Sequence, residues 1–310
     1  MASIEHAPTA SAVPGRHAFW AEQAYVFFML GVTTAGAAAA LSLAVIHGVA
    51  WFYIALFGVT VLYTTFGVTA GLHRYFSHKS FRCKRWFEVL LAALGISAGQ
   101  DFFIRWVYVH RVHHRNTDVL GDPHSPYFDR ARPSSGLYGL YYSHIGWLFH
   151  RQHEVETSVV PDLVRDPLWV TMDRYSPLLT LLGLLLPGGL SLLYQPTAFS
   201  FVQGVLWGGF ARLFLIYHVS WGVNSLGHYF GPKVPGQDHG ARNNIVLGVI
   251  ALGDGWHANH HEYASSARHG FGWQLDLTYL ALRVCERLGW VWDLKLPPQA
   301  RQETFAAAYR

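Results

Sequence analysis

Four long apolar runs constrain the fold of this chain more than any other feature of its sequence. They cover residues 24–46, 49–70, 176–194 and 198–221. Each is close to the roughly 20 apolar residues that a helix needs to cross a bilayer. Short turns join the first run to the second and the third to the fourth, so each pair predicts a helical hairpin. We therefore predict an all-α integral membrane protein with four transmembrane helices in two hairpins.

Composition agrees with a membrane environment. Only 14% of the residues are charged and 51% are hydrophobic, whereas soluble domains carry about 25% charged residues. A soluble protein with four apolar core helices is the alternative, but these runs lack the polar faces that such helices carry. No linker separates independent halves, so we expect one domain over residues 1–310, with residues 1–20 as a flexible tail.

Basic residues predict the orientation of the spans. The segment between the two hairpins, residues 71–175, contains thirteen Lys or Arg residues, and such loops face the cytoplasm. Both termini would then be cytoplasmic. The short apolar runs 86–99 and 245–253 are too short to span and are expected at the membrane interface. Residues 275–288 form a further amphipathic stretch. The chain is short, which suggests a bacterial cytoplasmic membrane.

Histidines form three clusters just outside the predicted spans. The clusters comprise His73 and His78; His110, His113 and His114; and His257, His260 and His261. The second and third have HxxHH spacing, and positions i, i+3 and i+4 share one face of a helix. The HxxxxH spacing of the first is poorer on a regular helix. It predicts a helix end, where the chain leaves the membrane and unwinds.

Eight histidines at one membrane face predict a metal site rather than ordinary packing. Imidazole suits zinc, copper, iron and nickel, while a structural zinc site takes four ligands and usually recruits cysteine. Cys83 and Cys285 lie outside the clusters. So many ligands imply two metal ions, and iron is the redox choice for activating oxygen, although other metals stay open.

Further motifs extend the pattern: residues 70–74, 122–124, 221–228 and 266–270. With the clusters, they resemble the membrane-bound acyl desaturase family, which contains acyl-CoA and acyl-lipid delta-9 desaturases, over nearly the whole chain after residue 20. The resemblance implies two iron ions and O2 as co-substrate. It adds His228 to the eight histidines as catalytic metal ligands and gives Asn224 a place near a metal through water. Trp221, Asn224 and His228 stand at i, i+3 and i+7, so they share a helical face.

The resemblance implies a fatty acyl desaturase that introduces a cis double bond into a long acyl chain, with delta-9 as the expected position. A hydroxylase or an acetylenase would use the same metal site. A metal transporter is a rival of another class, but beyond Arg212 and His218 the spans contain few polar groups. The acyl chain could be attached to CoA, a lipid or a carrier protein. Electrons would come from a separate ferredoxin or cytochrome b5 type protein. No nucleic-acid motif is present.

An apolar tunnel between the helices would hold the substrate. Trp221 is expected beside it, and the resemblance places Val61 and Thr65 where they would close its far end, with ordinary helix packing as the alternative. Asp254 and Ala258 depart from the residues that relatives often have. Neither change removes a ligand, but both could affect substrate placement or the orientation of a ligand.

Other histidines, arginines and lysines lie outside the three clusters. Arg212 has either a functional role or a structural hydrogen-bonding role, and His218 is expected to be a hydrogen-bonded interior residue. His124 and His269 could lie just outside the ligands. Surface or interface positions are expected for His144, His150 and His153. The basic residues Lys79, Arg82, Lys84 and Arg85 fit the topology without a headgroup role. The histidines without an expected role are His6, His17, His47 and His239.

Overall fold

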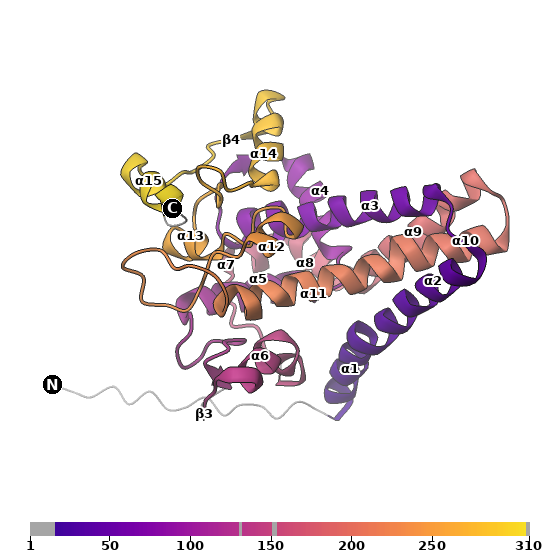
Figure 1. The fold of residues 1–310 in the computed structure, drawn as a ribbon, viewed down its shortest axis with the longest axis horizontal. Helices are drawn as coiled ribbons and strands as arrows, with labels where there is room; N and C mark the ends of the chain where they lie inside the picture. Colours follow the sequence, from indigo (N-terminus) through magenta and orange to yellow (C-terminus); the bar gives the residue numbers. More distant parts are fainter. Residues whose placement is uncertain (1–15, 130–131, 151–153, 308–310) are drawn as a thin grey trace.

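A bundle of long helices carries a compact cap at one end (Figure 1). The computed structural model describes residues 16–129, 132–150 and 154–307. Within them, four helices are long and apolar enough to cross a membrane: Glu22–His47, Trp51–Ser77, Ser176–Tyr194 and Ala198–His228. They confirm the four predicted spans and the two hairpins. Four such helices in two hairpins fit a membrane protein.

Several of these spans change helical type along their length. The first consists of α1 (Arg16–Phe27), the π-helical turn η1 (Phe28–Val32) and α2 (Thr33–His47), and the second of α3 (Trp51–Phe66) and the π-helix η2 (Gly67–Ser77). The third is α9 (Ser176–Tyr194). The fourth contains α10 (Ala198–Gly204), η4 (Val205–Ala211), α11 (Arg212–Ser225) and η5 (Leu226–His228). Residues 16–20, assigned above to a tail, are helical, and residues 1–15 lie outside the described part.

The second span ends at the first histidine cluster as predicted, since Ser77 is its last helical residue and His78 follows it, but the chain does not unwind between His73 and Ser77. It continues as η2, in which hydrogen bonds run from residue i to i+5. The amide of His78 donates to the carbonyl oxygen of His73 across 3.2 Å. The wide turn therefore brings the two histidines of the HxxxxH pattern together.

Two glycines let another helix approach η2 closely. A Cβ atom at Gly67 would lie 2.4 Å from the carbonyl carbon of Leu94, and one at Gly71 would lie 2.8 Å from the carbonyl oxygen of Leu91. Both neighbours are backbone atoms of α4 (Arg85–Ile96), which cannot move aside as a side chain can. Small residues at these two positions thus set the packing of α4 against the histidine-bearing turn.

Arg212 holds the spans together inside the bundle. It is fully buried. Its guanidinium donates to the hydroxyls of Tyr63 and Thr64, both at 2.9 Å, and to the carbonyl oxygens of Ser97 and Gly183 at 3.4 and 3.0 Å. These partners come from α3, α9 and the end of α4, so they favour the structural role weighed for this residue.

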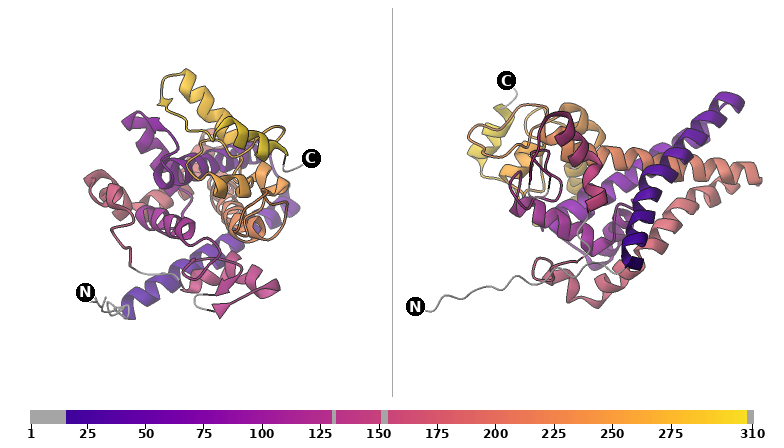
Figure 2. Two further views of the ribbon diagram at one scale, coloured as in Figure 1. Left: turned by 90° about the vertical axis from the view of Figure 1, so that its left-hand side faces the viewer. Right: turned by 90° about the horizontal axis from the view of Figure 1, so that it is seen from below.

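The cap is built from short helices and two small antiparallel sheets around the end of the bundle (Figure 2). Its other helices are α5 (Phe103–Arg115), α6 (Gly136–His144), η3 (Gly146–His150), α7 (Pro161–Val164), α8 (Pro167–Arg174), α12 (Ile245–Ile250), α13 (His257–Glu262), α14 (Leu277–Arg287) and α15 (Gln299–Ala307). Strand β1 (Arg82–Cys83) pairs with β4 (Val291–Trp292), and β2 (Phe128–Asp129) pairs with β3 (Arg132–Pro133).

The short apolar runs behave as expected from their length. Residues 86–99 form most of α4 and residues 245–253 contain α12, and neither is long enough to span. The amphipathic stretch forms α14, in which Leu282 and Cys285 are buried while Leu280 and Val284 are exposed.

Candidate metal centre

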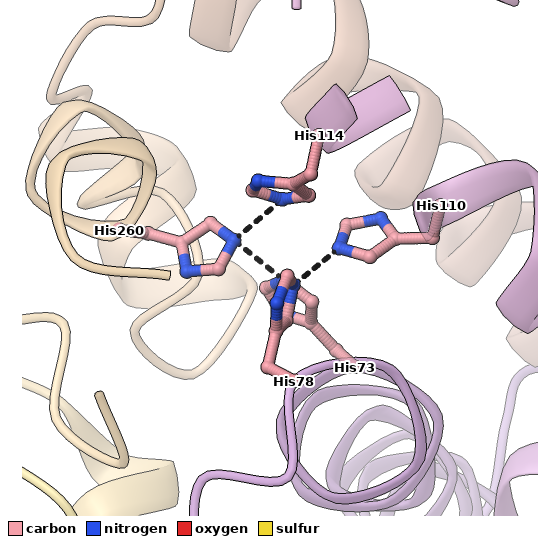
Figure 3. A group of neighbouring side chains, drawn as sticks. All are labelled: His73, His78, His110, His114 and His260. Carbon is pink, nitrogen blue, oxygen red and sulfur yellow. Dashed lines mark hydrogen bonds between the residues drawn. The ribbon is translucent and has the colours of Figure 1, made fainter. Parts of the chain in front are cut away.

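Five histidines converge where η2, α5 and α13 meet. They are His73, His78, His110, His114 and His260, called here the first histidine group (Figure 3). One ring nitrogen from each lies within 4.8 Å of the others. The Nε2 atoms of His73 and His260 are 2.9 Å apart, and those of His78 and His110 are 2.7 Å apart.

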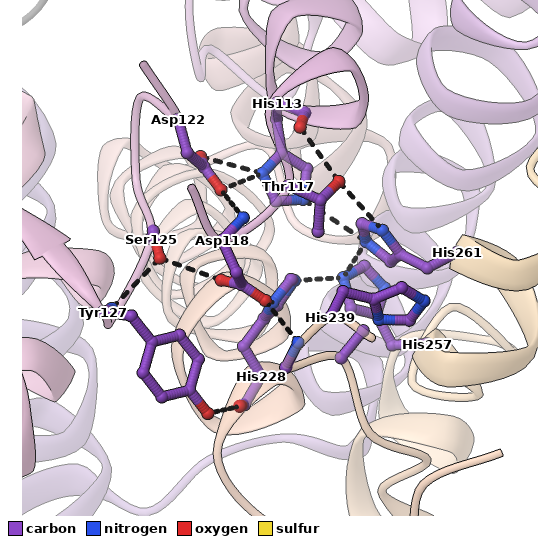
Figure 4. A network of polar contacts seen from close by, with 12 residues as sticks. His113, Thr117, Asp118, Asp122, Ser125, Tyr127, His228, His239, His257 and His261 are labelled. Carbon is purple, nitrogen blue, oxygen red and sulfur yellow. Dashed lines mark hydrogen bonds and ion pairs between the residues drawn. The ribbon is translucent and has the colours of Figure 1, made fainter. Parts of the chain in front are cut away.

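Four more histidines form the second histidine group beside the first. They are His113, His228, His257 and His261 (Figure 4). The Nε2 atom of His257 lies 2.9 Å from that of His228 and 3.0 Å from that of His261. His113 and His261 approach to 3.3 Å through the same atoms. The structure thus brings together all nine histidines singled out from the sequence.

The HxxHH spacing explains how two helices supply both groups. On α5, His110 and His114 stand at i and i+4 and enter the first group, while His113 enters the second. On α13 the assignment is reversed: His257 and His261 enter the second group and His260 the first. Each of these two helices therefore lies between the two histidine groups and contributes histidines to both.

Burial keeps most of these rings neutral. It lowers the pKa well below 6.5 for His78, His110, His114, His257, His260 and His261, and the neighbouring histidines lower it further. A neutral imidazole has one N–H and one nitrogen lone pair. The centre therefore offers lone pairs rather than positive charges.

Carboxylates on the outer side of three rings fix which nitrogen carries hydrogen. The pairs are His73 with Asp254 at 2.7 Å, His113 with Asp122 at 2.9 Å and His228 with Asp118 at 2.8 Å. In each pair the Nδ1–H donates to the carboxylate, so the lone pair of Nε2 points at the other histidines. Carboxylate–histidine pairs of this kind orient metal ligands and raise their basicity.

The donor atoms fit two cations. In each group the ring nitrogens lie within 4.8 Å of one another in a largely buried space, an arrangement that a bound cation stabilises. The Nδ1 atoms of His257 and His260 are buried without a hydrogen-bond partner among the described residues. Two separate groups match the two ions expected from the number of ligands. The histidine clusters could therefore hold metal ions, and imidazole suits iron among several metals.

A largely apolar cavity opens beside both groups. Its wall includes His73 and His110 from the first group and His113 and His257 from the second. Other lining residues include Thr65, Val68, Trp106, Val109, Trp147, Ile216, Val219, Trp221 and Asn224, and a smaller polar part of the wall comes from Thr69, Gln100, Asp101 and Ser220. Trp221, Asn224 and Thr65 therefore line the same cavity as the histidines. Val61, by contrast, is half-buried and is not part of this wall.

Two further histidines lie just outside the groups, as expected. The Nδ1 atom of His269 is 3.2 Å from a carboxylate oxygen of Asp254, the partner of His73. The ring of His124 packs 4.4 Å from that of His113, tilted by 34°, and lines the cavity. Burial lowers the pKa of His269 to about 4 and that of His124 to about 3.

The remaining histidines divide into one pair and several separate positions. His218 is hydrogen-bonded as predicted, because its Nδ1 atom lies 3.1 Å from Nε2 of His144. The Nδ1 atom of His144 in turn lies 2.9 Å from the hydroxyl of Ser225. His47 and His150 are exposed. His6 and His153 lie outside the described residues.

His239 was set aside as incidental, and that prediction is wrong. Its ring packs 5.2 Å from the ring of His261 (Figure 4). Periodicity could not have found it, because it lies in a loop and belongs to no spaced cluster.

The roles of the carboxylates Asp118 and Asp122 were not predicted from the sequence, although residues 122–124 were noted as a motif. They follow the second histidine cluster by four and eight residues, and an acidic residue so soon after HxxHH is the signal that could have pointed to them. Burial alone would raise the pKa of both, but their contacts with His228 and His113 lower it below its usual value.

Residues 50–272 match the model of the family described as fatty acid desaturase. The chain belongs to the fatty acid desaturase family. It is 37% identical to hex-5-enoyl-[acyl-carrier protein] acetylenase of Moorena producens over 74% of this chain and 73% of that protein. It is 35% identical to sn-1 stearoyl-lipid 9-desaturase of Anabaena variabilis, over 74% and 79% of the two chains. An acyl-CoA 5-desaturase of Anemone leveillei is 32% identical, over 81% and 73%.

Membership confirms the expected class of enzyme, an oxidoreductase acting on fatty acyl substrates. The predicted resemblance is likewise confirmed, including delta-9 lipid desaturases among the relatives. The assignment of individual histidines and Asn224 as metal ligands stays a prediction, and so do the substrate roles of Trp221, Thr65 and Val61.

Proposed function

We propose that this chain uses O2 to introduce a cis double bond, at delta-9, into a long fatty acyl chain. Two iron ions would be held by the nine histidines of the two groups. The single observation that carries this proposal is the opening of one apolar cavity onto both groups. A substrate without polar atoms near the reacting carbons fits such a wall, and the relatives include lipid 9-desaturases.

The protein side chains would hold the metal and place the substrate. Iron held in the two groups would activate O2, and O2 would supply the oxidising power to remove hydrogen from unactivated methylenes. His73, His113 and His228 are pre-oriented by their carboxylates, so little rearrangement is needed on binding. The cavity wall, which includes Val68 and Trp221, would hold one pair of carbons in reach of both groups and exclude water.

The electron balance requires a partner. Reduction of O2 to two waters takes four electrons, and forming one double bond releases two. The other two must come from a reductant, for which we propose a one-electron carrier of the ferredoxin or cytochrome b5 type. We further propose that the cap and both termini face the cytoplasm of a bacterial cell, supported by the thirteen basic residues between the hairpins.

An acetylenase is the second candidate, favoured by one observation. The chain is 37% identical to a relative named as an acetylenase acting on hex-5-enoyl-[acyl-carrier protein]. Such an enzyme removes two hydrogens from a double bond that already exists. The same cavity and histidine groups would serve that reaction, so the product decides between the two candidates.

Expression in a bacterial host without its own desaturase tests the proposal. Fatty acids would be analysed for the wild-type chain, for His113→Ala and for His47→Ala, the exposed control. Purified protein with a supplied electron donor would then receive the same acyl chain on CoA, on carrier protein and in lipid. A cis double bond at delta-9, absent only in His113→Ala, is the expected result. A triple bond would establish the acetylenase. Absence of product with all three carriers from iron-loaded wild-type protein would contradict the proposal.

A further inference from the structure

His261 is less firmly held on its outer side than three other members of the two groups. Its Nδ1 atom lies 3.4 Å from the hydroxyl of Thr117, whereas His73, His113 and His228 reach carboxylates at 2.7–2.9 Å. Its ring is instead flanked by His239 at 5.2 Å, with the planes tilted by 47°. Stacking on the ring of His114 at 4.3 Å and packing against His239 therefore take the place of the carboxylate contact that orients His73, His113 and His228.

His239 is itself fixed in place from several directions. Its Nε2 atom lies 3.3 Å from a carboxylate oxygen of Glu262, and the other oxygen of Glu262 pairs with Arg301 of α15. Its carbonyl oxygen accepts hydrogen bonds from Lys233 at 2.7 Å and from Gln237 at 2.9 Å. The side chain is only 12% exposed. A residue held this way can support its neighbour.

The next residue in the chain reaches a second member of the same group. The amide of Gly240 donates to Oδ2 of Asp118 across 2.8 Å, and that oxygen also accepts from Nδ1 of His228 at 2.8 Å. A Cβ atom at Gly240 would lie 2.7 Å from this oxygen and 2.4 Å from the ring of Tyr127. Position 240 thus has no room for a side chain.

A small apolar cluster joins this loop to the helix that carries the third histidine cluster. Val234 of the loop, Ala258 of α13, Phe271 and Phe305 of α15 are all buried in it. The loop, α13 and α15 therefore pack as one unit around the second histidine group.

We propose that the 231–242 loop is a positioning element for the second histidine group, in which His239 orients His261 and Gly240 holds Asp118 against His228. The inference rests on the proposed metal-binding function and deepens it. The contacts of His239 and Gly240 described above go to the second group and its partners. Changes at these two residues therefore weaken the binding of one of the two ions and leave the affinity for the other unchanged.

Titration of ferrous iron into metal-free, full-length protein in detergent tests this inference without measuring activity. The wild-type chain is expected to bind two ions. In His239→Ala and in Gly240→Ala, one ion should bind about 10- to 100-fold more weakly, the usual effect of losing an outer partner of a metal ligand. Mössbauer spectra of ⁵⁷Fe-loaded protein should then show the loss of one iron signal at limiting iron.

Two control variants, His47→Ala and Arg283→Ala, and one further test variant, Arg301→Ala, separate positioning from a general loss of stability. His47→Ala removes an exposed histidine at the far end of the first hairpin and should bind iron as the wild type does. Arg301→Ala breaks the pair with Glu262, and Arg283→Ala breaks a comparable exposed pair with Glu286 on α14. Of these variants, only Arg301→Ala should weaken the binding of one ion.

Three outcomes would overturn the inference: unchanged binding of both ions in His239→Ala and Gly240→Ala, equal weakening of both ions, or a wild-type chain that binds a single ion. Failure of the proposed function would look different. In that case the wild type would bind two ions, the loop variants would lose one, and no acyl product would form.

Discussion

The Nδ1–H of His73 donates to Oδ2 of Asp254 across 2.7 Å, although 181 residues separate the two in the chain. The other oxygen of Asp254 accepts from Arg74 at 2.9 Å, so two consecutive residues of η2 share one carboxylate. Arg74 is fully buried and also pairs with Asp276 at 3.0 Å. This carboxylate therefore links the orientation of a predicted metal ligand to the pairing of a buried charge.

Replacing Asp254 with asparagine should lower both iron affinity and thermal stability. The amide would keep the shape of the side chain but remove the charge that orients His73 and balances Arg74. We expect about 10- to 100-fold weaker binding of one ferrous ion and a lower unfolding temperature, measured by iron titration and by thermal unfolding in detergent. Asp293→Asn, at an exposed pair with Arg82, is the control and should change neither. An unchanged iron affinity in Asp254→Asn would refute this role.

Adding one methyl group at Gly67 should disturb the packing of α4 against η2. The new Cβ atom would meet the backbone of Leu94 at 2.4 Å, and overpacking of this kind costs about 1–3 kcal/mol. At Gly58, in the preceding α3, nothing lies within 4 Å of the corresponding Cβ. Gly58→Ala should therefore be neutral or should stabilise the helix by up to about 1 kcal/mol. Thermal unfolding of both variants in detergent checks the prediction, and equal unfolding temperatures would count against it.

A larger side chain at Thr65 should shorten the cavity. Thr65 lines its wall, whereas Val61, one turn away, does not. Thr65→Phe is expected to shift the products toward shorter acyl chains, and Val61→Phe to leave the product profile as it is. Gas chromatography of fatty acids from the expressing host gives the chain lengths, and iron content shows whether the metal centre is intact. A larger shift from Val61→Phe would place the end of the substrate elsewhere.

Acid should weaken the link between the first two histidine clusters. Asp162 accepts from Arg111 of α5 at 2.7 and 2.9 Å and from Lys79, which follows His78, at 2.6 Å. Burial alone would raise the pKa of Asp162, but these hydrogen bonds outweigh it and lower the pKa to about 2. A lowered folded-state pKa stabilises the fold above the ordinary value of 3.8, and that contribution is lost as pH falls toward 2.

Asp162→Asn removes the titrating group, so it tests this sign directly. The wild type should be more stable than the variant near neutral pH, and the difference in unfolding temperature should shrink between about pH 5 and pH 2. A difference that stayed constant over this range would show that ionisation of Asp162 does not contribute. Asp293→Asn again serves as the exposed control.

The spans and the histidine clusters could be predicted because both are local patterns. A run such as 176–194 needs only its own residues to show that it can cross a bilayer, and α9 has those bounds. The three histidines of α5 are aligned by the geometry of a single helix. Asp118 and His239 were missed for the opposite reason: their contacts with His228 and His261 join distant parts of the chain and leave no periodic trace.

The π-helix was missed because its cause is also tertiary. The residues of η2 contain no helix breaker other than glycine, and the wide turn depends on packing against α4 and on the partners of its side chains. The partners of Arg212 could not be predicted for the same reason. Its charge in the fourth span was visible in the sequence, but the hydroxyls and carbonyls that satisfy it come from three other segments.

The wide turn of η2 makes the length of this segment as restrictive as its composition. On an α-helix, two residues five apart would point about 140° away from each other. Along η2 and its C-terminal cap, His73 and His78 come to the same side because each turn takes up an additional residue. Inserting or deleting one residue here would separate the two rings even if every histidine were kept. We therefore expect the number of residues between them to vary less in evolution than the residues themselves.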